Sequence, residues 1–189
     1  MELYEAIEKR RTIRVYKQKA TEEQLRRIIL AGTRAPSATN RQPWEFIIVD
    51  DQDAIDRLAE LKYLLNRRPD PDRPEKDPAV REKKARQQRK FFQNAAVVAM
   101  CHQVGWERSL WLCIQNMSLA ALEEGLGSCI VLYWEKEKKE AEKLLNIPDS
   151  HELTAIMKFG VPAKENHPVP KRRPDFSWLH KNRFGEKMI

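Results

Sequence analysis

The chain has 189 residues, 41% of them hydrophobic, which suits one domain with a buried core and includes no apolar run long enough to span a membrane. The net charge is +7 at pH 7. Residues 66–90 carry +5 of it with no aromatic residue before Phe91 and Phe92, which argues for a solvated helix and loop and against a nucleic-acid surface.

The chain begins with MELYEAIEKRR, which contains acids and no apolar stretch, so we expect no signal peptide. Residues 2–9 predict a short amphipathic helix. The helix leads into Arg10-Arg11-Thr12-Ile13-Arg14, in which every second side chain points to one side if the chain is extended. Paired guanidinium donors suit a phosphate. The segment is therefore a candidate phosphate site, with a solvated basic turn as the alternative.

A second helix is expected to begin at Thr21, with Gln24 in the capping-box position. It leads to a loop of small and polar residues, Ala35–Asn40. The next residues, Trp44–Val49, are mostly apolar at both even and odd positions, so they predict an interior strand covered on both faces. Such a loop can hold a flat ligand against its backbone amides, although an ordinary helix-to-strand connection is the alternative.

Asp50–Asp53 are expected to cap a third helix, and the proline-rich residues 66–77 form a candidate lid. The helix expected over residues 106–124 is apolar nearly all round, so we expect it in the core or at a subunit interface. The tail, with Phe176, Trp178 and Phe184 among prolines, predicts an extended arm. Further helices are expected over residues 79–93 and 135–145, and strands over residues 95–101, 128–133 and 153–161.

Three cysteines lie in apolar segments without a CxxC pair, namely Cys101, Cys113 and Cys129. They indicate core thiols in a reducing compartment, the cytoplasm, and no metal site. The His151-Glu152 pair does not complete an HExxH motif, because position 155 is alanine. The alternation of helices and strands predicts an α/β or α+β sheet covered on both faces.

Four motifs now stand in register along the chain: RRTIR, PSATNRQPWEF, GLGSC, and FGVPA followed by KRRP. Together they resemble the FMN-dependent nitroreductase family over nearly the whole chain. The resemblance implies an α+β sandwich with a mixed, mostly antiparallel sheet flanked by helices, which forms an intertwined homodimer. It implies one FMN-binding domain over residues 1–189, with residues 66–90 as a basic insert or lid and residues 166–189 as a C-terminal arm.

The resemblance also implies residue roles. The RRTIR segment holds the flavin phosphate and ribityl chain, and the PSATN loop covers the flavin of the other subunit. The backbone after GLGSC runs beside the flavin ring, and the late arginine at the phosphate is best matched by Arg172, with Arg173 as its neighbour. Leu132 departs from the glycine of many relatives and would narrow the space over the ring. The implied cofactor-binding residues are Arg10, Arg11, Thr12, Arg14, Pro36, Ser37, Ala38, Asn40, Ile130, Val131, Leu132, Arg172 and Arg173.

The implied activity is that of an oxidoreductase in which NADH or NADPH reduces FMN, and an electron-poor acceptor such as a nitroarene or quinone then takes the hydride. Because flavin carries the chemistry, no catalytic side chain is expected. The expected partners are a second copy of the chain and a small-molecule acceptor, without nucleic acid or membrane. Two alternatives stay open: another flavin reaction on the same fold, reductive dehalogenation or flavin fragmentation, and a non-enzymatic protein that binds FMN or nucleic acid.

Overall fold

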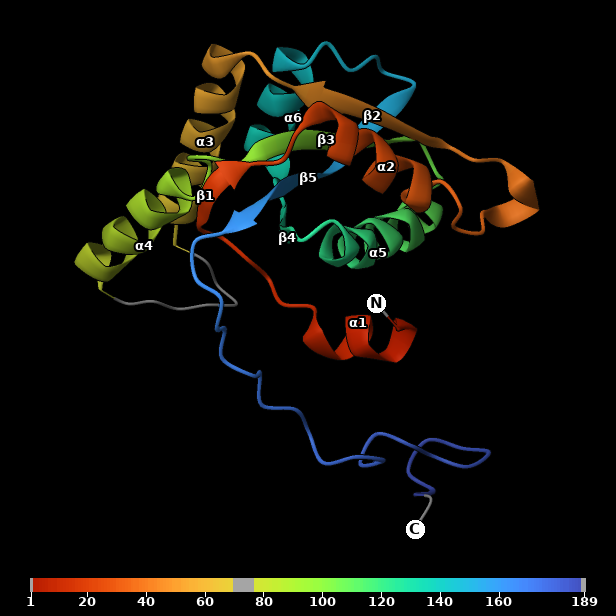
Figure 1. The fold of residues 1–189 in the computed structure, drawn as a ribbon. Helices are drawn as coiled ribbons and strands as arrows, with labels where there is room; N and C mark the ends of the chain where they lie inside the picture. Colours follow the sequence, from red (N-terminus) through yellow and green to blue (C-terminus); the bar gives the residue numbers. More distant parts are fainter. Residues whose placement is uncertain (1, 70–76, 188–189) are drawn as a thin grey trace.

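The structure is a computed structural model that describes residues 2–69 and 77–187, and it contains a five-stranded sheet with helices on both faces (Figure 1). Its elements in chain order are α1 Leu3–Lys9, β1 Tyr16–Lys19, α2 Glu22–Gly32, the 3₁₀ helix η1 Ala38–Asn40, β2 Trp44–Val49, α3 Gln52–Arg67, α4 Pro78–Lys90, β3 Ala96–Gln103, α5 Glu107–Glu123, β4 Gly127–Val131, α6 Glu135–Leu144 and β5 His151–Pro162.

Strand β5 organises the sheet, since β1, β3 and β4 all pair with it in antiparallel ladders. Strand β2 extends the sheet by pairing antiparallel with β3, from Trp44 opposite His102 to Val49 opposite Val97. A parallel bridge between Thr12 and Ser128 attaches the segment before β1 to β4. The predicted α+β class with a mixed, mostly antiparallel sheet is therefore confirmed.

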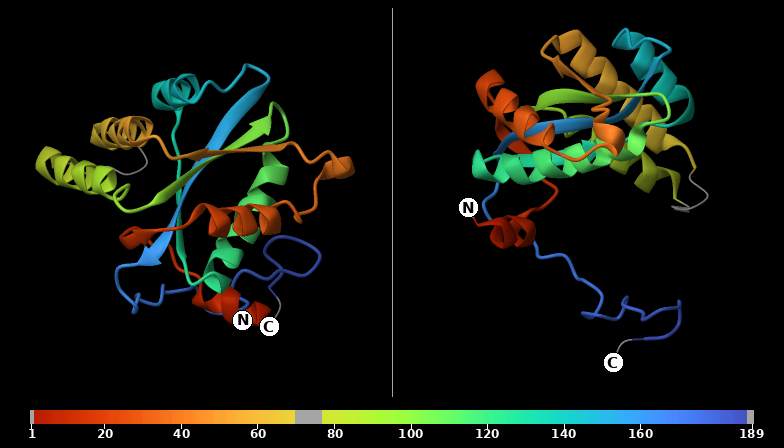
Figure 2. Two further views of the ribbon diagram at one scale, coloured as in Figure 1. Left: turned by 45° about the horizontal axis from the view of Figure 1, so that its top comes forward. Right: turned by 90° about the vertical axis from the view of Figure 1, so that its right-hand side faces the viewer.

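Two apolar cores lie on opposite faces of the sheet. Helices α2 and α5 cover one face, where Ile28, Leu110 and Met117 pack against alternate residues of β3 and β5. Helices α3 and α6 cover the other face, where Leu58 and Ala141 contribute to the second core, and α4 packs beside α3. The views in Figure 2 show these layers, with α1 and the C-terminal arm lying apart on the α5 side. No helix among the described residues is long and apolar enough to cross a membrane.

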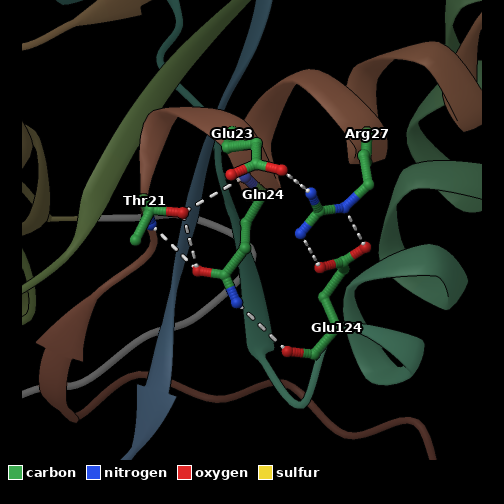
Figure 3. A network of polar contacts seen from close by, with 5 residues as sticks. All are labelled: Thr21, Glu23, Gln24, Arg27 and Glu124. Atoms are coloured by element: carbon green, nitrogen blue, oxygen red, sulfur yellow. Dashed lines mark hydrogen bonds and ion pairs between the residues drawn. The ribbon is translucent and has the colours of Figure 1, made fainter.

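Helix α2 is fastened at its start and to the end of α5 by the polar network in Figure 3. The Thr21 hydroxyl accepts from the Gln24 amide at 3.2 Å, and the Gln24 side chain accepts from the Thr21 amide at 3.0 Å, so the predicted capping box is confirmed. Arg27 binds both carboxylate oxygens of Glu124 at 2.8 Å. This partly exposed ion pair adds to the apolar packing of α2 against α5 in the first core.

Three expectations about the strands and helices need correction. Strand β2 has the predicted bounds, but it is an edge strand of the described chain and not an interior one. Strand β4 ends at Val131, so Leu132 and Tyr133 lie beyond the ladder. Tyr133 is nevertheless buried, and its hydroxyl donates to the Leu58 carbonyl at 2.7 Å. Helix α4 ends three residues before the expected position 93, because Phe91 caps it.

The candidate lid over residues 66–77 falls mostly on residues 70–76, which lie outside the described residues. At its ends, Asn66 and Arg67 belong to α3, and Asp77 is the N-cap of α4. The arm has no helix or strand from Lys164 to Pro174, but it is not extended throughout, because it turns over residues 175–178 and folds back on itself through a bridge between His180 and Lys187. Its aromatic residues Phe176, Trp178 and Phe184 are exposed.

The capping box at Thr21 gives a test of this part of the fold. Replacing an N-cap hydroxyl by a methyl group leaves a helix amide without its acceptor, so we expect Thr21→Ala to lower the free energy of unfolding by about 1 kcal/mol. The measurement is urea denaturation of the purified protein. Thr21→Ser keeps the acceptor and serves as the control, which should stay within a few tenths of a kcal/mol of wild type. Equal losses in both variants would contradict the capping role.

Candidate functional site

A cavity of about 720 Å³ lies between three segments that are far apart in sequence: residues 10–15 before β1, the last turn of α4 and residues 163–172 after β5. Among the described residues that line it, none is acidic. The lining residues are Arg10, Arg11, Thr12, Arg14, Val15, Gln87, Phe91, Ala163, Lys164, Asn166, His167, Pro168, Pro170 and Arg172. The structure thus brings the RRTIR segment together with Arg172.

The first wall of the cavity is anchored through Ile13. Its amide donates to the Ser128 carbonyl at 2.9 Å, and its carbonyl accepts from the Tyr16 hydroxyl. The Ile13 side chain is buried and fills the space over Gly127, where an added Cβ would lie 2.5 Å from the Ile13 Cβ. Because neighbouring side chains point to opposite sides, burial of Ile13 turns Thr12 and Arg14 outward.

The charges of the cavity are not compensated by carboxylates. Within the described chain, the side chains of Arg10, Arg14 and Arg172 form no ion pair and no hydrogen bond with another residue. Arg11 differs, because its guanidinium donates to two backbone carbonyls, that of Glu8 and, at 2.9 Å, that of Arg10. Also, His167 Nε2 is buried without a hydrogen-bond partner in the described structure. Converging cations with free donors form a site for an anion.

Beneath the cavity lies a buried cation, Lys158 on β5, whose residue is only 1% exposed. Its ammonium donates to the Phe91 carbonyl at 2.6 Å and lies 4.6 Å from the centre of the Phe92 ring. The pKa of this ammonium is lowered to about 8, mainly by burial; Cys129 opposes the shift, and the positive charges of Arg14 and Lys62 add to it. A cation held at such a cost is typical of functional sites.

The loop that includes Pro36, Ser37, Ala38 and Asn40 does not line the cavity. It projects at the far end of β2, next to the start of α5 (Figure 1). The loop has a fixed shape: Ser37 Oγ accepts from the Gln42 amide at 2.9 Å, and the Arg41 guanidinium lies 4.7 Å from the centre of the Trp106 ring. Thr39, Asn40 and Gln42 all have positive φ, near 50°. Residues other than glycine rarely adopt this backbone conformation, so the loop stores local strain.

Residues Ile130, Val131 and Leu132 likewise do not line the cavity, and neither does Arg173. Val131 is buried, whereas Ile130 and Leu132 are each 38% exposed. The backbone here is held from α3, because the Lys62 ammonium donates to the Leu132 carbonyl at 3.1 Å. This hydrogen bond ties the exposed segment after β4 to α3.

Sequence reasoning missed several residues at the site. Lys164 and His167 lie in the tail just before the KRRP motif, and their basic character was a usable signal. Lys158 was visible as the single charged residue in the apolar strand LTAIMKFGV. Nothing in the sequence indicated Gln87 and Phe91, since only the tertiary position of α4 brings them to the cavity. No group of three His, Cys, Asp or Glu residues that could hold a metal ion occurs in the part of the chain that the structure describes.

Comparison with known proteins gives consistent matches. The model of the nitroreductase family matches residues 7–161. The chain is 31% identical over 180 residues to an iodotyrosine deiodinase of Thermotoga neapolitana, covering 89% of this chain and 91% of the relative. It is 28% identical over 190 residues to an NADH dehydrogenase of Thermus thermophilus, covering 85% and 86%. A crystal structure of oxidized iodotyrosine deiodinase bound to FMN and 3-iodo-L-tyrosine superposes with a TM-score of 0.77 at 28% identity, covering 91% of this chain and 95% of that one.

The buried ammonium predicts a specific dependence of stability on pH. The pKa of Lys158 is about 8 in the folded chain and 10.5 in the unfolded chain, so the unfolded chain binds more protons between these values. Stability from this group therefore rises as pH increases from 8 to 10.5. Relative to Lys158→Met, which lacks the group, wild type should gain on the order of 3 kcal/mol of unfolding free energy over this interval.

The measurement is urea denaturation of both proteins at several pH values from 7 to 10.5. All other titrating groups are common to the two proteins, so their difference isolates Lys158. Parallel stability curves would mean that Lys158 is already neutral at pH 7 or titrates normally.

Proposed function

The chain belongs to the nitroreductase family, and from this membership we propose that it is an FMN-dependent oxidoreductase. It takes reducing equivalents from NADH or NADPH and delivers them to an electron-poor small molecule such as a quinone or nitroarene. The observation that carries the proposal is the meeting of Arg10 and Arg14 with Arg172, from opposite ends of the chain, on one cavity that has no carboxylate among its described lining residues.

The residues of the cavity fit the phosphate end of FMN. Arg10, Arg14 and Arg172 supply charged donors that no described residue occupies, and the buried Nε2 of His167 lacks a partner within the described chain. In this proposal Arg11 shapes the segment through its bonds to backbone carbonyls, and its charge adds to the attraction. FMN, when bound, supplies the two-electron chemistry, so the chain itself needs only to bind, orient and exclude water.

A second copy of the chain completes the site in this proposal. Pro36, Ser37, Ala38 and Asn40 lie away from the cavity of their own chain, and we assign them to the flavin of the partner. Ile130, Val131 and Leu132 present their backbone to the flat part of the cofactor, and Arg173, which does not line the cavity, makes no contact with the cofactor in this proposal. Support for a homodimer comes from large exposed apolar residues on α1 and the arm, including Leu3, Tyr4, Phe176, Trp178 and Phe184.

We further propose one FMN-binding domain over residues 1–189, in which residues 66–90 border the substrate and residues 166–189 form the arm that contributes Arg172. Three buried, reduced cysteines support a cytoplasmic location.

A second candidate function is reductive dehalogenation of a halogenated aromatic amino acid. It is favoured by the full-length similarity to the two proteins named iodotyrosine deiodinase, at 31% and 28% identity. Both reactions would use the same cofactor cavity, so the acceptor distinguishes them.

The cofactor assignment predicts different effects for two neighbouring arginines. Loss of a charge-assisted hydrogen bond costs about 1.5–3 kcal/mol, so Arg172→Ala should raise the FMN dissociation constant roughly ten- to a hundredfold. Arg14→Ala should act similarly. Arg173→Ala is the matched control, because Arg173 does not line the cavity, and it should change the constant less than threefold. The measurement is fluorescence titration of the apoprotein with FMN, and equal effects of the two C-terminal variants would remove Arg172 from the site.

The reaction is tested by adding NADH or NADPH to the purified protein. We expect a yellow protein that bleaches with a reduced nicotinamide and whose kcat/KM for a quinone or nitroarene exceeds that for 3-iodotyrosine at least tenfold. Faster release of iodide from 3-iodotyrosine would replace the first proposal by the second. A colourless protein that takes up no FMN and shifts DNA would overturn both.

A further inference from the structure

Helix α4 forms one wall of the cavity and packs mainly against α3, not against the sheet. Of its 13 residues only Ala85 is buried. Its ties to α3 include the hydrogen bond from the Tyr63 hydroxyl to Glu82 at 2.9 Å and the ion pairs of Glu82 with Arg67 at 3.0 Å and of Arg89 with Glu60 at 2.9 Å. Partly exposed polar ties of this kind contribute little each.

The C-terminal end of α4 is different, because a buried cation binds it. Phe91 is the C-cap of the helix, and its carbonyl accepts from the Lys158 ammonium at 2.6 Å. Carbonyl groups at a helix C-terminus have no partner within the helix, and positive charge is favourable there. The ammonium also lies 5.7 Å and 4.6 Å from the ring centres of Phe91 and Phe92.

The carbonyl that Lys158 holds belongs to a residue of the cavity wall. Phe91 and Gln87, one turn earlier, both line the cavity, and the Phe91 amide donates to the Gln87 carbonyl at 3.2 Å. A movement of this last turn would therefore move both side chains. The other end of the Lys158 residue is anchored in the sheet, where it lies opposite Val97 and Cys129.

We propose that Lys158 is a positioning residue of the cofactor cavity: by binding the Phe91 carbonyl, its buried ammonium fastens the last turn of α4 to strand β5 and fixes the Phe91 and Gln87 wall. This inference rests on the proposed FMN site for its consequence in binding, but the fastening itself is a property of the protein alone. Charged or titratable groups that face Lys158 are Cys129 on β4, Arg14 before β1 and Lys62 on α3, with the Tyr16 hydroxyl on its carbonyl.

The first experiment needs no cofactor. Hydrogen exchange is compared in wild type, Lys158→Met and the control Lys143→Met, which removes a lysine from the distant helix α6. The amides of Phe91, Phe92 and Gln93, which all donate to α4 carbonyls, should exchange at least tenfold faster in Lys158→Met only. Unchanged exchange at these three amides would overturn the fastening role.

The second experiment separates positioning from simple attraction of the phosphate. FMN and riboflavin, which lacks the phosphate, are titrated against each protein. If Lys158 holds the wall, Lys158→Met should raise the dissociation constants of both flavins by a similar factor, about tenfold. A rise for FMN alone would overturn the proposal in favour of a long-range charge effect, and no rise for either would overturn it as well.

A double-mutant cycle adds a test that does not depend on Lys158→Met alone. Phe91→Ala keeps the backbone carbonyl but removes the wall side chain, so it should weaken both flavins, and the combination with Lys158→Met should be clearly less than additive. Unchanged flavin affinity in Phe91→Ala overturns the proposal even if the lysine variant does not fold. If wild type binds neither flavin, the proposed function fails, whereas the exchange experiment still decides the fastening.

Discussion

The structure depends above all on the hydrogen-bonded ladders of strand β5. Its twelve residues pair with β1, β3 and β4, so both apolar cores and both ends of the chain are placed relative to this strand. The same strand leads directly into the residues that complete the cavity, starting at Ala163, whose amide donates to the Val15 carbonyl at 3.0 Å. The basic N-terminal segment and the start of the arm thus meet because they flank the same end of one strand.

This arrangement brings like charges together, with no carboxylate among the described residues that line the cavity, which is unfavourable unless an anion binds. The chain carries a further cost below the cavity, where the Lys158 ammonium is removed from water. The burial of the two apolar cores, whose residues do not line the cavity, offsets both unfavourable free-energy terms. A site of this kind is stabilised by its ligand, so binding of an anionic cofactor should raise the stability of the whole protein.

Much of this could be predicted from local patterns. The apolar run Trp44–Val49 predicted the bounds of β2, and the hydroxyl at Thr21 predicted the start of α2, because both features depend on neighbours in sequence. The place of β2 at the sheet edge was not predictable, since apolar side chains on both faces say nothing about which strands pair. The α4 wall was missed for the same reason: Gln87 and Phe91 reach the cavity only through tertiary packing. Lys158 stood out in its apolar strand, but only its carbonyl partner on Phe91 gives it a role.

The strained shape of the loop after α2 is maintained within a single chain. Its positive φ angles at Thr39, Asn40 and Gln42 are held by contacts within its own chain, such as Arg41 against Trp106. The cost of its shape is therefore met on folding and not on assembly. In the proposed homodimer this rigid loop reaches the cofactor of the partner, so one bound cofactor contacts two chains. Cofactor binding and dimerisation are then linked: whatever free energy the cofactor gains from the second chain, the dimer gains from the cofactor.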